Sequence, residues 1–255
     1  MDSNRKTVLI SLVGVIAAIG LMVGAGFGIA RAIRGGVRQL DNDSGRTIVR
    51  IQDEQGDLSG NAAVMEMGFD DEQLSGFDTI KTLGGWSVVI TGGDRYDVSV
   101  TGSESALADV NVFTRNNVLH LEIRSGLRSV TGNLKAVVVL PDLERFESAG
   151  SANVTLSELD LDRLSLDVDG AASLRANNVR IEDLSIDVNG ASSLDFSNAE
   201  VINANVDMDG ASNLDITMAG GVLTGQVSGL GEVSYGGSIT TQNIDVDGLG
   251  RVRQR

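Results

Sequence analysis

The feature that most constrains the fold is a glycine that recurs through the second half of the chain. The phrases AGSANV, DGAASL, NGASSL, DGASNL, SGLGEV and DGLGRV place it at Gly150, Gly170, Gly190, Gly210, Gly229 and Gly248. The steps between these glycines are 20, 20, 20, 19 and 19 residues. A fixed period of this length indicates stacked units, none of which can bury its apolar face alone.

The residues before each repeat glycine alternate between apolar and polar. In LSLDVDG, residues 164–170, leucine or valine occupies every second position, and LSIDVNG and ANVDMDG follow the same pattern. A period of two is typical of strands with one buried face, and residues 80–255 contain no helical apolar stripe. We therefore predict an all-β fold, a right-handed β-helix-like solenoid with coils of about 20 residues. Its stacking predicts one interior column: Val168, Val188, Met208 and Val227.

The polar residues beside the repeat glycine have two interpretations. The first is a structural turn, in which glycine adopts positive φ and the preceding Asp or Asn binds nearby backbone N–H groups. The second is calcium binding, because parallel strands about 4.8 Å apart would stack the carboxylates into ladders whose repulsion Ca²⁺ would relieve. The motif lacks the EF-hand loop and the glycine-rich nonapeptide of calcium-binding β-rolls. The calcium candidates are Asp167, Asp169, Asp187, Asn189, Asp207 and Asp209.

Longer alternating runs, such as WSVVITGG, YDVSVTGS and LKAVVVLP, precede the repeats. We predict one β-solenoid domain over residues 76–255, divided into a longer-strand subregion, 76–141, and regular repeats, 142–255. Within the repeats, we expect the polar side chain of Ser212 on the solvent face.

The N-terminal region contains an uncharged apolar run of 24 residues, 7–30. A helix of this length spans a hydrocarbon core of about 30 Å, and the run is longer than the apolar part of a typical cleavable signal. We predict a transmembrane anchor with basic flanks over 1–34, in contact with the lipid bilayer through 7–30. A polar linker or stalk over 35–75 would follow, which makes the chain a single-pass membrane protein.

Composition argues against several functions. The formal net charge of −15 repels phosphate backbones, so we expect no nucleic-acid partner. Cysteine is absent and His120, expected on the solvent face beside Glu122 and Arg124, is the only histidine. A serine triad or a histidine metal cluster would depend on this one residue. We therefore predict no enzyme, no catalytic residue and no cofactor.

The order of the strand-like segments resembles a known family. The segments FDTIKTLGGWSVVITGGDRYDVSVTGS, NVLHLEIRSG and AVVVLPDLERFESAGSANV, followed by repeated DGAASL-like turns, resemble the head GIN domain of auto-transporter adhesins. The resemblance covers about residues 76–255 and belongs to a family of unknown function. It implies a β-helix-like domain exported to the bacterial envelope, on the periplasmic or extracellular side, and it supplies no catalytic residues.

Two functions follow from these observations, with a third as a further alternative. The first is a non-enzymatic, membrane-anchored envelope protein whose solenoid displays a surface for adhesion to an unknown protein or glycan partner. The second is a structural scaffold that self-assembles as a homo-oligomer, with the charged terminal RVRQR capping one end of the solenoid. The third is a carbohydrate-active β-helix enzyme, although Trp86, Tyr96 and Tyr235 are the only Trp and Tyr residues available for sugar stacking.

Overall fold

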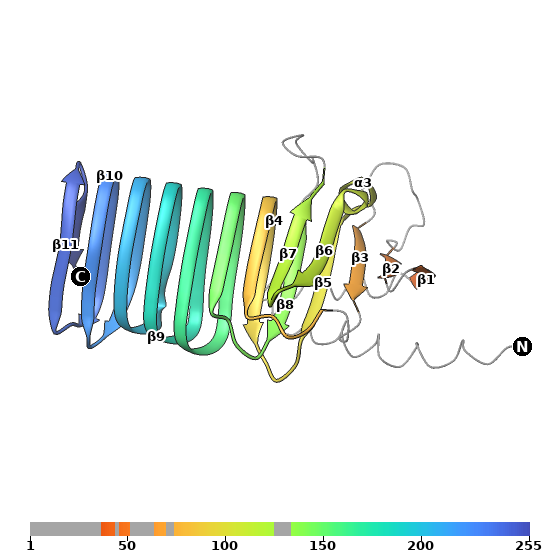
Figure 1. Ribbon diagram of the computed structural model, residues 1–255, viewed down its shortest axis with the longest axis horizontal. Coiled ribbons are helices and arrows are strands. Elements are labelled where there is room, and N and C mark those ends of the chain that lie inside the picture. Colours follow the sequence, from red (N-terminus) through yellow and green to blue (C-terminus); the bar gives the residue numbers. More distant parts are fainter. Residues whose placement is uncertain (1–36, 44–45, 52–63, 70–73, 125–133) are drawn as a thin grey trace, which may run out of the picture.

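The computed structural model describes residues 37–43, 46–51, 64–69, 74–124 and 134–255. In these residues the chain forms one sheet of twelve strands, and α3 (Glu104–Ala108) is a single helical turn beside it. The sheet extends from β1 at one end to β11 at the other, and Figure 1 shows its second half as a regular stack.

The first half of the sheet is mixed. Five strands pair antiparallel in the spatial order β1 (Val37–Asp43), β2 (Arg46–Ile51), β3 (Val64–Phe69), β5 (Asp97–Ser103) and β8 (Lys135–Leu140). The hairpin of β6 (Val110–Arg115) and β7 (Val118–Ile123) is antiparallel as well. Both β7 and β8 then pair in parallel with the long strand β4 (Thr79–Gly92).

The second half is parallel throughout. It comprises β9 (Arg145–Ala219), β10 (Val222–Ser238), β11 (Thr241–Gly248) and β12 (Arg251–Gln254). The 75 residues of β9 wind through successive coils, where a coil is the passage from one repeat glycine to the next, and these coils lie side by side between β4 and β10 (Figure 1). The register puts Gly150 beside Gly84 and Gly210 beside Gly229, so the repeat glycines form one column.

The core lies inside the coils, because between the corners of each coil every second side chain of β9 faces inward. The expected interior column of Val168, Val188, Met208 and Val227 is confirmed, with each side chain at most 2% exposed. The largest fully buried side chains include Phe77, Phe146 and Phe196.

The predicted right-handed β-helix-like solenoid is wrong as a description of this fold. The sheet is mixed and does not form a closed solenoid. One physical reason lies at Asn116 and Asn117, whose φ values of 52° and 63° form a tight turn that returns β7 antiparallel to β6. The 20-residue period is confined to residues 142–255, and so it gave no signal of this antiparallel pairing.

The predicted transmembrane helix also needs correction. A membrane-spanning helix needs about 20 apolar residues, and none of the helices in the described part of the chain is long and apolar enough. Residues 7–30, on which the prediction rested, lie outside the described residues. Among the described residues, no helix supports the predicted single-pass membrane protein with its solenoid on the periplasmic or extracellular side. The stretch predicted as a linker over 35–75 contains β1, β2 and β3.

Candidate functional site

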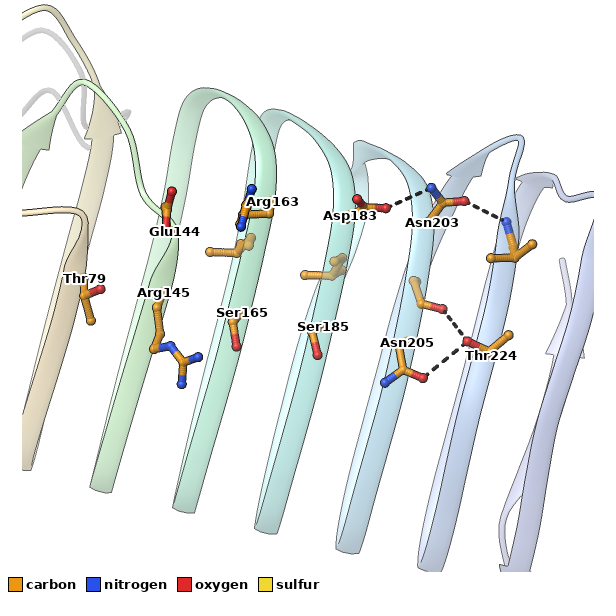
Figure 2. Close-up of a pocket in the computed structure, with 14 residues that line it drawn as sticks. Thr79, Glu144, Arg145, Arg163, Ser165, Asp183, Ser185, Asn203, Asn205 and Thr224 are labelled. Carbon is orange, nitrogen blue, oxygen red and sulfur yellow. Dashed lines mark hydrogen bonds between the residues drawn. The ribbon is translucent and has the colours of Figure 1, made fainter.

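A groove of about 650 Å³ crosses the coils five to seven residues before the repeat glycines (Figure 2). Its outer wall is a column of side chains that each stand five residues before a repeat glycine: Arg145, Ser165, Ser185, Asn205 and Thr224. Leu164, Leu184 and Ala204 also line the groove and are almost fully buried. The groove is therefore a surface that repeats once per coil, with polar walls and an apolar floor.

One end of the groove satisfies its own hydrogen bonds. Asn203 donates through Nδ2 to Asp183 Oδ1 at 2.9 Å, and its Oδ1 accepts from the backbone N–H of Val222 at 3.2 Å (Figure 2). Thr224 donates through Oγ1 to Asn205 Oδ1 at 3.3 Å. These contacts connect neighbouring coils and fix the side-chain amides in place.

The other end has free hydrogen-bonding groups. Within the described residues, Arg163 has no ion-pair partner, and the hydroxyls of Ser165 and Ser185 make no side-chain hydrogen bond. Arg145 is partly engaged, because its Nη1 lies 3.7 Å from Glu147 Oε1. A guanidinium and two hydroxyls on successive coils are thus available to a ligand that lies along the stack.

A second groove, of about 670 Å³, lies at the other corner of the same coils. Arg180 is the only basic side chain among the described residues that line it, and it lies 3.8 Å from Asp160 Oδ1 and 3.5 Å from Glu200 Oε2. Asp160 and Glu200 therefore share Arg180 across three coils, while Glu158 also lines the groove. Its one guanidinium is engaged, unlike that of Arg163 in the first groove, and it provides a control surface on the same coils.

A row of carboxylates runs beside the first groove, two residues further along each coil. Its members, in register across the sheet, are Glu147, Asp167, Asp187 and Asp207. Lys81 on β4 closes one end of the row, with Nζ 2.6 Å from Glu147 Oε2. Burial, followed by the charges of Asp167 and Asp207, raises the pKa of Asp187 above its ordinary value.

The calcium candidates occupy this row and the neighbouring one, which contains Asp169, Asn189 and Asp209. In the parts of the chain that the structure covers, no group of three or more His, Asp or Glu side chains has a geometry that would hold a metal ion. Calcium binding remains a prediction from the sequence.

The six repeat glycines, Gly150, Gly170, Gly190, Gly210, Gly229 and Gly248, have positive φ between 98° and 137°. At each of them, a Cβ would meet the carbonyl oxygen of the preceding glycine in the column, for example at 2.6 Å from Gly84 O in the case of Gly150. Close stacking of the backbone at this corner therefore requires glycine, and the corner itself presents no side chain to a ligand.

His120 is a packing residue in this structure. Its ring stacks on Phe113 with 4.5 Å between ring centroids, and only 19% of its side chain is exposed. Nδ1 lies 3.3 Å from Glu122 Oε1, in a geometry that does not form a hydrogen bond. The sequence placed His120 on the solvent face, but the stacking on Phe113 half-buries it.

The groove side chains were not recognised in the sequence. A signal for them existed, because Arg145, Ser165, Ser185, Asn205 and Thr224 share one position in the repeat. They lie two positions before the carboxylates of Glu147, Asp167, Asp187 and Asp207 and differ in chemical type from coil to coil, so no motif marks them.

The fold and the groove define a class of repeat-built all-β proteins with a polar-walled groove across stacked coils. The chain belongs to the family described as "Putative auto-transporter adhesin, head GIN domain", whose model matches residues 76–217. This result confirms the resemblance seen in the order of the strand segments.

A crystal structure described as a putative adhesin, from Bacteroides fragilis, is similar at a TM-score of 0.54 and 15% identity. The match covers 75% of this chain and 97% of that one, and at this identity it shows a shared fold. A putative lipid binding protein from Parabacteroides distasonis matches with a TM-score of 0.48, 14% identity and 77% and 98% coverage. A putative adhesin from Parabacteroides merdae matches with a TM-score of 0.45, 16% identity and the same coverage. No curated protein matches the chain.

Proposed function

We propose that this protein is a non-enzymatic adhesion module that binds an uncharged, hydroxyl-rich glycan chain along the first groove. Membership of the adhesin-head family supports an adhesion or binding role. The observation that carries the choice of ligand is the groove itself, in which Arg163, Ser165 and Ser185 offer free donors and acceptors on successive coils. An extended polymer with regularly spaced hydroxyls fits such a surface.

The charge of the protein favours a neutral ligand over an acidic one. The formal net charge is −15, and the row from Glu147 to Asp207 lies beside the groove. This field repels anionic polymers. Side-chain amides, hydroxyls and one guanidinium fork still provide directed hydrogen bonds to sugar hydroxyls.

The carboxyls of the groove support binding more than hydrolysis. Glycoside hydrolysis needs two carboxyls that flank one bond. Among the described residues, Glu144 and Asp183 are the only carboxyl side chains that line this groove. They stand on different coils with Arg163 between them along the chain, and Asp183 accepts a hydrogen bond from Asn203. We therefore assign them no catalytic role.

The proposal is tested by binding of the purified protein to immobilised neutral and acidic polysaccharides. Arg163→Ala should weaken binding to a neutral glycan by about tenfold or more, since a hydrogen bond to a charged donor contributes about 1.5–3 kcal/mol. Asn205→Ala should weaken it by about threefold to tenfold. Arg180→Ala and Asn198→Ala make the same changes in the second groove and should leave binding unchanged.

The dependence on salt separates the ligand classes. Binding to a neutral glycan should be nearly constant as salt increases, whereas binding to a charged polymer falls. Equal losses from Arg163→Ala and Arg180→Ala, or binding confined to acidic polymers, would contradict the proposed site.

A further inference from the structure

The sheet ends in an open edge at its C-terminal side. β11 and β12 pair with β10, and among the described residues neither has a strand on its other side (Figure 1). Such an edge presents unpaired backbone N–H and C=O groups, which makes it a site for pairing with another strand.

This last coil also exposes an apolar side chain that the equivalent position of the preceding coil buries. Val246 is 40% exposed, whereas Val227, its neighbour in the same column on β10, is 1% exposed. Leu249, at the corner between β11 and β12, is 84% exposed. A further strand across the edge would cover Val246 as β11 covers Val227, whereas the corner leucines Leu230 and Leu249 are exposed on both of the last coils.

The sequence of the edge is symmetric about Leu249, with its charges reversed. In DVDGLGRVR, residues 245–253, Val246 corresponds to Val252 and Gly248 corresponds to Gly250. Asp247 and Asp245 correspond in the same way to Arg251 and Arg253. The acidic arm is β11 and the basic arm is β12, and they meet at the corner.

From this relationship we infer that the edge binds a second copy of the same chain, with a two-fold axis through the corner at Leu249. β11 runs toward the corner and β12 runs away from it. A half-turn about an axis through the corner, in the plane of the coil, therefore places β11 of one copy antiparallel to β12 of the other. In that register, residues that are equidistant from Leu249 face each other, so Asp247 lies opposite Arg251 and Asp245 opposite Arg253. A two-fold interface requires such self-complementarity.

The charges at the edge are arranged to accept this partner. Arg251 Nη2 lies 2.6 Å from Glu232 Oε2, and Arg253 binds the other oxygen of Glu232, so both guanidiniums are held on the β10 side. Asp245 and Asp247 are exposed and have no ion-pair partner among the described residues. In the pair, each arginine would lie between Glu232 of its own chain and an aspartate of the second copy. Opposite charges directly across an antiparallel pair stabilise it.

The test uses disulfide capture in the full chain, which contains no cysteine. In the proposed pair, Leu249 faces itself across the two-fold axis, so Leu249→Cys should form a covalent dimer on mild oxidation. Leu230→Cys is the matched control, because Leu230 is exposed in the same column one coil further from the edge. Its distance from its own copy should exceed the range of about 7 Å between Cα atoms within which disulfides form. Equal cross-linking of both variants, or a monomeric Leu249→Cys, would overturn the inference.

Charge reversal tests the register. In the Leu249→Cys background, Asp247→Arg alone and Arg251→Asp alone should each lose most of the covalent dimer, because each places like charges opposite one another. An equimolar mixture of the two proteins should recover it, since the mixed pair places an arginine opposite an aspartate at both contacts. Failure of the mixture to recover the dimer would overturn the proposed register. Arg163→Ala should leave cross-linking unchanged, so a failure of the groove and a failure of the edge are distinguishable.

Discussion

Ser192 and Ser212 form a hydrogen bond inside the stacked coils. Ser192 Oγ donates to Ser212 Oγ at 3.1 Å, and Ser212 is only 2% exposed. Both serines stand two residues after a repeat glycine, on the inner side of the corner. The equivalent position of the two preceding coils is occupied by Ala152 and Ala172.

This pair predicts a non-additive effect on stability. Ser212→Ala should lower the free energy of unfolding by about 1–2 kcal/mol, because the buried hydroxyl of Ser192 loses its acceptor. The double variant with Ser192→Ala should cost less than the sum of the single variants, since alanine already fits this column. Urea unfolding followed by circular dichroism measures the three values. Exposed Ser193→Ala is the control, and strictly additive losses would show that the hydrogen bond has no energetic role.

Ser212 also shows where the sequence was misread. Residues 209–211 at the corner are exposed, and the alternation then resumes in the same phase, so Val206, Met208, Ser212 and Leu214 all face inward. The expectation of an exposed Ser212 followed its polarity and was wrong. The inner side of the corner accommodates small residues, and a paired serine fits there as well as alanine does.

The column of repeat glycines leads to a second prediction. Gly150→Ala should destabilise the fold by about 2 kcal/mol or more, because φ is +123° and the new Cβ would lie 2.6 Å from Gly84 O. Gly85→Ala is the matched control, since no atom lies within 4 Å of a Cβ at that position. The melting temperatures of both variants show whether the destabilisation comes from backbone strain in the glycine column or from replacing any glycine by alanine. A Gly150→Ala protein as stable as Gly85→Ala would contradict the argument.

The sequence predicted the parallel half of the sheet much better than the mixed half. The repeat positions from Gly150 to Gly248 make the register of the coils visible, because each residue pairs with one 19 or 20 positions away. The antiparallel pairing of β5 with β8 joins Asp97 to Val139, across β6 and β7. Such contacts have no local pattern, so alternation predicted the strands but not their partners. The groove was missed for a different reason. Its side chains share one repeat position, but they are polar and dissimilar, so they form no recognisable motif.

The carboxylate row predicts how stability depends on pH. The pKa of Asp187 is raised by burial and by Asp167 and Asp207, so the folded protein binds this proton more tightly than the unfolded chain does. The ionised side chain therefore lowers the free energy of unfolding at neutral pH. This destabilisation disappears as the pH falls through the folded-state pKa. Asp187→Asn should raise the melting temperature at pH 7, and the difference from the unmodified protein should disappear at about pH 3, near the ordinary pKa of aspartate.

The experiment requires melting curves of both proteins across this pH range, in buffer that contains a chelator. Asp94→Asn, in the exposed loop between β4 and β5, is the control and should have the same melting temperature as the unmodified protein in each buffer. Repeating the melting curves at pH 7 with excess Ca²⁺ tests whether the carboxylate row binds calcium. If the carboxylates hold a cation, Ca²⁺ raises the melting temperature of the unmodified protein and Asp187→Asn loses that gain. If they only repel one another, the variant is the more stable protein with or without Ca²⁺, and the row is a structural consequence of the repeat.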